Sequence, residues 1–333
     1  MALPETLANR LTIPAIAAPM TGVSGPELVI AACRNGVIGS FPTHNAATTG
    51  ELDSWLRDIN SALESADHTG PLAPVAPNLV VHKTNDRLRD DLDCLVRHGA
   101  ELVITSVGSP KPVIAPLHDI GCRVFADVSS MAHVRRALDA GVDGLVLLSA
   151  GAGGQTGWAN PLAFVRTVRP HFDGPIVLAG GICDGISMLA AQVLGADLVY
   201  LGTKFIATDE SMADDAYQTA LIESTIDDVK LSTRVGGIPA SLLASWLALD
   251  GASAVGTASS DGFRQDRLLS NRTAWSAGHS VAGVDAITSV AEVIDAIAQQ
   301  YERAQEQMFG QLATSRSRRR AAGTEPNPQI VTR

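Results

Sequence analysis

Residues 175–185 of the chain read PIVLAGGICDG, and residues 198–205 read LVYLGTKF. Both are short apolar runs with glycine near the carboxyl end, and both are followed by residues with helical spacing. Parallel strands that are buried on both faces have such continuous apolar runs, whereas strands with one face in water alternate. The two segments therefore predict neighbouring parallel strands that end in glycine turns.

The same pattern recurs throughout the first 210 residues. Earlier apolar runs occupy residues 14–20, 37–41, 72–81, 101–107, 123–128 and 144–150, and the clearest amphipathic stretches between them are 50–66, 86–98 and 130–140. Alternating strands and helices allow an open doubly wound sheet or a closed barrel. Because eight units fit within roughly 200 residues, we favour an α/β fold of the (β/α)8 TIM-barrel type.

The strand–helix alternation stops near residue 205, which suggests a further division of the chain. We expect the barrel at 1–210, a small helical lid domain inserted after strand eight at 211–267, a C-terminal return to the barrel at 268–310, and a disordered tail at 311–333. Helices are expected at 213–225 and 240–251 from their apolar spacing, and a final helix at 286–301. The tail is basic and rich in small residues, which is typical of mobile chain ends.

The composition limits the class of protein. Its 333 residues are 46% hydrophobic and 18% charged, with a formal net charge of −10, which is typical of a globular chain and disfavours a nucleic-acid partner. The sequence lacks an apolar run of the roughly 18 residues that a membrane helix needs, and it begins without a secretory signal, so we expect a cytoplasmic protein with no membrane partner. Four scattered cysteines predict reduced thiols and no metal site.

Glycines at the ends of the last two predicted strands indicate a phosphate site. Gly180 and Gly181 follow the seventh strand, and Gly202 and Thr203 follow the eighth. In (β/α)8 barrels the loops after these strands commonly hold a phosphate, because glycine lets backbone N–H groups approach the oxygens. The alternative is that the glycines only form tight turns.

A second glycine-rich segment, LLSAGAGGQTGWANP at 147–161, follows the sixth strand. Its glycines would let a flat cofactor or substrate approach the main chain closely. Active sites of barrels lie at this end of the strands. Gln155 is the polar side chain of this loop with the reach to contact a ligand.

Five segments share their order and spacing with a known family. They are AAPMTGVSGPELVIAACRNGVIGSFPT (17–43), SAGAGGQTG (149–157), DGPIVLAGGICDG (173–185), GADLVYLGTKFIATDES (195–211) and NRTAWSAGHSVAGV (271–284). From about residue 11 to residue 301 the chain resembles the nitronate monooxygenases, formerly called 2-nitropropane dioxygenases. The resemblance implies an FMN-dependent (β/α)8 barrel, with FMN at the top of the barrel and a small helical domain over it.

The resemblance also implies which residues contact FMN. Gly180, Gly181, Gly202 and Thr203 would hold its phosphate. Residues 18–21 would pass the isoalloxazine ring, and Asn78 would bond its pyrimidine side. The full set of expected contacts outside the phosphate site is Ala18, Pro19, Met20, Thr21, Asn78, Asp127, Ala152, Gly153, Trp275 and Ser276.

One position departs from the family's pattern. Many members carry a histidine as the catalytic base where this chain has Gln155. An amide cannot take up a proton near neutral pH, but it can donate a hydrogen bond to a developing oxyanion. We name Gln155 as a catalytic hydrogen-bond donor, and His44, which follows the second strand, as a candidate base.

These observations predict an FMN-dependent oxidoreductase that oxidises nitronates, or a similar small or hydrophobic substrate, with O2. One alternative is a flavin-dependent reductase or dehydrogenase of enones, quinones or acyl-CoA thioesters, in which Gln155 donates a hydrogen bond. A second is a flavin-binding protein without turnover. NAD(P)H is an alternative co-substrate to O2, and a homodimer is left open.

Overall fold

The computed structural model describes residues 3–65, 70, 72–249 and 262–321. Eight parallel strands form one sheet in the order β2-β1-β9-β8-β6-β5-β4-β3. They are β1 (Ala15–Ala17), β2 (Ile38–Gly39), β3 (Asn78–Val80), β4 (Leu102–Ser106), β5 (Arg123–Val128), β6 (Gly144–Leu148), β8 (Ile176–Ala179) and β9 (Leu198–Leu201). Bridges from Gly39 to Val75 and from Pro42 to Asn78 join the two edges of the sheet. The ring of strands therefore closes. The predicted (β/α)8 TIM barrel is confirmed, and the alternative of an open sheet is not.

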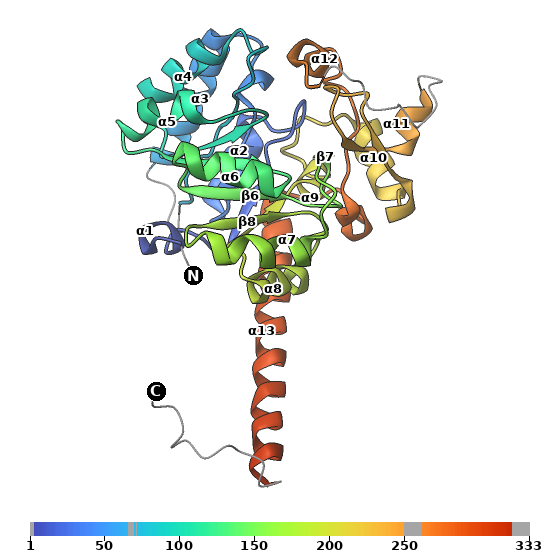
Figure 1. The fold of residues 1–333 in the computed structure, drawn as a ribbon. Helices are drawn as coiled ribbons and strands as arrows, with labels where there is room; N and C mark the ends of the chain where they lie inside the picture. The colour runs from blue at the N-terminus through green and yellow to red at the C-terminus, as the bar shows by residue number, and fades with distance from the viewer. Residues whose placement is uncertain (1–2, 66–69, 71, 250–261, 322–333) are drawn as a thin grey trace.

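Helices surround the barrel (Figure 1). They are α1 (Glu5–Ala8), α2 (Pro26–Arg34), α3 (Thr49–Glu64), α4 (Leu88–Arg97), α5 (Lys111–His118), α6 (Met131–Ala140), α7 (Pro161–Val168), α8 (Gly185–Leu194) and α9 (Thr203–Ile206), with short 3-10 turns at Thr43–Asn45, Arg169–His171, Ile226–Asp228 and His279–Gly283. Local signals set their ends. In α8 the Asp184 side chain accepts from the Ser187 backbone N–H, and Gly195 ends the helix at a φ of 107°, a conformation that glycine adopts readily.

The inside of the barrel changes character along the strands. A buried layer of apolar side chains fills its centre: Ile16, Ile38, Ile104, Phe125, Val146, Val177 and Leu198. Because side chains alternate along a strand, the residue two positions further faces the same side. The next inward layer, at the carboxyl ends, is Ala18, Ser106, Asp127, Leu148 and Tyr200. This partly polar layer forms the floor of the candidate site.

The segment after β9 is not wholly helical, contrary to the expectation. It holds α10 (Asp215–Glu223), β10 (Val229–Ser232), β11 (Ala240–Leu243), α11 (Ala244–Leu249) and α12 (Gln265–Leu269). β11 pairs with β10 and with β7 (Gly154–Gln155) in an antiparallel sheet. The predicted helix at 240–251 therefore begins with a strand, because a short apolar run does not distinguish a buried strand from a buried helix.

The last helix, α13 (Val290–Ala321), is longer than expected and projects beyond the barrel (Figure 1). It contains residues 311–321, so the expected disordered tail is wrong for this part, while residues 322–333 lie outside the described residues. The alanines and arginines of this stretch are good helix formers. Within the described part of the chain, no helix combines the length and hydropathy needed to cross a membrane. The domain boundaries at 210, 267 and 310 remain predictions.

Candidate active site

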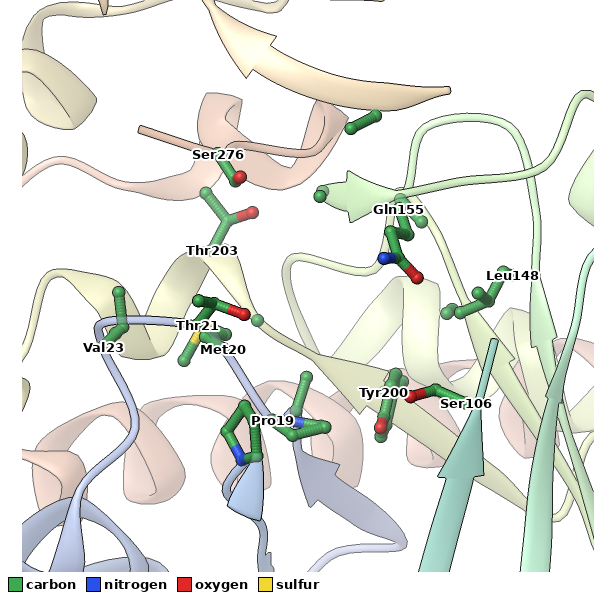
Figure 2. A pocket seen from close by; sticks show the side chains of 18 of the residues that line it. Pro19, Met20, Thr21, Val23, Ser106, Leu148, Gln155, Tyr200, Thr203 and Ser276 are labelled. Atoms are coloured by element: carbon green, nitrogen blue, oxygen red, sulfur yellow. The ribbon is translucent and has the colours of Figure 1, made fainter. Parts of the chain in front are cut away.

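A pocket opens at the carboxyl ends of the barrel strands. Its empty volume, including the solvent-filled space at its mouth, is about 1240 Å³. Figure 2 shows side chains from several strands and loops meeting there. The sequence-predicted residues that line it are Ala18, Pro19, Met20, Thr21, His44, Asn78, Asp127, Ala152, Gly153, Gln155, Gly180, Gly181, Gly202, Thr203 and Ser276. The barrel thus brings together residues that are up to 258 positions apart in the sequence, from Ala18 to Ser276.

Trp275, unlike the other residues predicted to contact FMN, does not line the pocket. Its ring stacks on Tyr217 with the centroids 5.7 Å apart. Tyr217 itself lines the pocket, and its hydroxyl donates to the Ser276 carbonyl. Trp275 therefore supports the wall from behind, because alternate residues of the returning segment face opposite sides.

Of the glycines after β8 and β9, Gly181 has open space beside its backbone. Gly181 has a φ of 73°, and a Cβ atom added there would meet nothing within 4 Å. Gly180 has a φ of 121°, and its Cβ would collide with the Ser149 hydroxyl. The Thr203 hydroxyl accepts from the Gly278 N–H at 3.0 Å, which leaves its own O–H to donate. This end of the pocket can therefore accept an anion close to the main chain.

The loop after β6 is held from two sides. Through β7, Gln155 pairs with Ala240 of β11. On the other side the Gly151 carbonyl accepts from the His279 N–H at 2.9 Å, and a Cβ on Gly153 would lie 2.8 Å from the Gly278 nitrogen. Glycine is thus required by the close approach of the returning chain. Figure 2 shows the Gln155 amide directed into the pocket from this fixed backbone.

His44 also lies in the pocket wall, but in a setting that disfavours its charged form. Its Nε2 lies 3.0 Å from the Thr21 hydroxyl oxygen, and its carbonyl accepts from Arg272. Burial, with the positive charges of Arg272 and Arg87, lowers the pKa of His44 to about 3. The imidazole is therefore neutral and only weakly basic at pH 7, which disfavours the role of substitute base.

The floor of the pocket carries a polar group of side chains, two of which, Ser106 and Tyr200, were not predicted from the sequence. The Ser106 hydroxyl donates to Asn78 Oδ1 at 3.0 Å. Burial raises the pKa of Asp127 to about 8, against the effect of the Asn78 side chain, which lowers it. Asp127 Oδ1 and the Tyr200 hydroxyl are buried without a hydrogen-bond partner among the described residues. Ser106 and Tyr200 could be found only from the inward register of β4 and β9.

The comparisons with known proteins agree with this geometry. The family model described as nitronate monooxygenase matches residues 72–300. The chain belongs to the nitronate monooxygenase family. A nitronate monooxygenase of Paraburkholderia phytofirmans is 27% identical over 261 residues, which cover 67% of this chain and 71% of that protein. A structure titled as nitroalkane oxidase from Streptomyces ansochromogenes has a TM-score of 0.78 at 21% identity and covers 91% of this chain and 100% of that one, which supports the fold.

Another relative has a different name. It is the (3aS,4S,5R,7aS)-5-hydroxy-7a-methyl-1-oxo-octahydro-1H-indene-4-carboxyl-CoA dehydrogenase of Rhodococcus jostii, which is 26% identical over 226 residues. The match covers 68% of this chain but 61% of that relative, so the chain spans less than two thirds of its length. Membership of the nitronate monooxygenase family therefore leaves the substrate open.

The pocket fits the flavin that the resemblance implies. The open space beside Gly181 suits a phosphate, since nothing within 4 Å occupies it. The floor offers hydrogen-bonding atoms without partners on Asp127 and Tyr200, as a polar ring edge requires. These features make the pocket a candidate flavin site of a nitronate monooxygenase family member.

Proposed function

We propose that the protein is an FMN-dependent oxidoreductase that oxidises nitronates, or a similar small hydrophobic substrate, with O2. The observation that carries the substrate preference is the chemistry of the pocket wall. Gln155 directs an amide into the pocket where many relatives have an imidazole base, and the pKa of His44 is lowered to about 3. A nitronate is already deprotonated, so its oxidation does not need the base that a neutral nitroalkane requires.

In this proposal the chain positions both the cofactor and the substrate. When bound, FMN supplies a ring that accepts electrons from the substrate and passes them to O2. Backbone N–H groups at Gly180, Gly181 and Gly202, with the Thr203 hydroxyl, would hold the phosphate. The Gln155 amide would donate to a substrate oxygen as negative charge grows on it. Its strand pairing with β11 limits the reorganisation that this bond requires.

Anaerobic mixing tests this proposal. The FMN-loaded protein is mixed without O2 with a nitronate, and in a separate sample with NADH or NADPH. We expect the nitronate to bleach the yellow oxidised flavin, and admission of O2 to restore it. A flavin that neither nitronates nor reduced nicotinamides can bleach would contradict an oxidoreductase and favour a flavin-binding protein without turnover.

A second function is favoured by the named relative of Rhodococcus jostii, a carboxyl-CoA dehydrogenase. A thioester, enone or quinone also presents a carbonyl oxygen to which Gln155 can donate. In that case Gln155 would orient the carbonyl, the bound FMN would supply hydride-transfer chemistry, and NAD(P)H rather than O2 would be the redox partner. Bleaching by NAD(P)H, followed by reoxidation with an enone, quinone or acyl-CoA panel but not with O2, identifies this alternative.

A further inference from the structure

Asp127 has an unusual position for a carboxyl group. It lies at the carboxyl end of β5, faces the barrel interior, and is the acidic residue among the described lining residues. The Asn78 side chain favours its ionised form and burial opposes it. Among the described residues, its Oδ1 is buried without a hydrogen-bond partner, and so is the hydroxyl of Tyr200, a neighbour in the same floor layer. A buried carboxyl oxygen without a partner points to a ligand that completes its bonding.

The surroundings of Asp127 do not compensate a negative charge. The described lining residues include neither lysine nor arginine. Neighbouring strands present Ser106 from β4 and Leu148 from β6, which carry no charge. His133 belongs to α6, the helix after β5, and is exposed on the outside of the barrel. Its Nδ1 lies 3.1 Å from the Ser129 hydroxyl oxygen. An ionised carboxylate would thus lie in a poorly solvated place without a cation.

The other titratable groups of the pocket stay neutral between about pH 6.5 and pH 9.5. The pKa of His44 is lowered to about 3 by burial and by Arg272 and Arg87. Burial raises the pKa values of Tyr200 and Tyr217 above their ordinary value. His133 has a lowered pKa, chiefly from partial burial. Asp127, with a pKa raised to about 8, is therefore the lining group that changes charge within this range.

We propose that Asp127 binds the flavin ring as an uncharged carboxylic acid that donates its O–H to a ring acceptor, so that FMN affinity depends on the proton at Asp127. The inference rests on the proposed FMN function. A flat ring that enters the barrel mouth lies on the floor layer, to which Asp127 belongs. The edge of the isoalloxazine ring has several carbonyl and nitrogen acceptors but a single N–H donor. A protonated acid in an apolar site can serve as such a donor.

The test is the dissociation constant of FMN, measured by quenching of FMN fluorescence on the cofactor-free full chain from about pH 6.5 to about pH 9.5. If the neutral acid alone binds FMN, a pKa of about 8 predicts affinity that is roughly 30-fold weaker at the upper end. The FMN phosphate loses its second proton near pH 6, below this range. Asp127→Asn keeps a donor that does not ionise, so its affinity should be flat over the range.

Two further variants make the result specific. Asp127→Ala removes the donor, so its affinity should be weak and flat. Asp143→Asn makes the same substitution at the other end of the barrel, where Asp143 accepts from the Val124 N–H at 2.7 Å, and it should keep the wild-type slope. Wild-type affinity that is flat, or that strengthens above pH 8, overturns the neutral-donor role while leaving the proposed function intact. Absence of FMN binding at every pH overturns both.

Discussion

Gln155 is a small departure from the family's pattern with a large chemical consequence. Its backbone belongs to β7, which pairs with β11, and its amide enters the pocket. We expect Gln155→Ala to slow turnover by about 10- to 100-fold, because a donor to a developing oxyanion is lost, while FMN content stays at the wild-type level. Steady-state rates and flavin absorbance of the purified variant measure the two effects. Unchanged turnover would remove Gln155 from the mechanism.

Gly181 tests the phosphate site. Gly181→Val would place a side chain in the space that we assign to the phosphate, and would also strain a residue with a φ of 73°. We expect FMN affinity to fall about tenfold or more, since the phosphate and the side chain compete for one volume. Gly121→Val is the matched control, because Gly121 has a φ of 77° and equally open space, but lies outside the pocket lining. Equal FMN affinity in the two variants would refute the assignment.

Most of the residues named from the sequence line one pocket, while their contacts with FMN remain predictions. Residues that follow strands in glycine-rich loops, such as Gly153 and Gly181, were found because such loops meet at one end of a barrel. Ser106 and Tyr200 were missed because each lies within an apolar run, and its inward direction is known only once the strand register is known. Trp275 and Ser276 were both predicted, and Ser276 is the one of the two that lines the pocket.

Among the elements, β11 shows where sequence patterns fail. ASLL at 240–243 is buried throughout, so it carries no periodicity to separate strand from helix. Its strand conformation depends on partners distant in sequence, the residues of β10 and the two residues of β7. Tertiary pairing, rather than local propensity, decided the structure of this segment.

Trp246 of α11 lies in the apolar cluster that supports one wall of the pocket. It is 9% exposed and packs in one cluster with the lining residues Val235 and Leu268. The centroid of its ring lies 4.9 Å from Arg234 Cζ. We expect Trp246→Ala to lower the free energy of unfolding by about 3 kcal/mol and to raise KM more than it lowers FMN content.

Urea denaturation and steady-state kinetics measure these effects of the Trp246 change. Trp158→Ala is the control for stability, because Trp158 is 85% exposed and should change the free energy of unfolding by less than about 0.5 kcal/mol. Equal losses in the two variants would contradict the supporting role of the cluster.

For the whole molecule, the barrel could be predicted because eight apolar runs and their spacing leave few topologies. The length of α13 could not, because the helix continues past the residues that pack on the barrel, where no periodic apolar face is needed.

The partly buried Asp127 also predicts how the stability of the cofactor-free protein depends on pH. Its pKa rises from 3.8 to about 8 on folding, so the folded state holds a proton that the unfolded state has lost. The contribution of Asp127 to the free energy of unfolding is fully present below about pH 4 and is lost as the pH rises through about 8. Between about pH 5 and pH 9 we expect the wild type to lose about 4 kcal/mol of unfolding free energy relative to Asp127→Asn. Urea denaturation at several pH values measures this, and parallel curves for the two proteins would contradict it.

Steady-state turnover of the FMN-loaded protein on a nitroalkane and on its own nitronate, with O2 as oxidant, shows whether the pocket supplies a general base. A missing general base typically costs about 10²- to 10⁴-fold in rate. Because Gln155 cannot accept a proton and the pKa of His44 is lowered to about 3, we predict that the nitronate is oxidised at least about 100-fold faster than the neutral nitroalkane. Comparable rates on the two substrates would contradict this prediction, because they would require a base other than Gln155 or His44, such as Asp127.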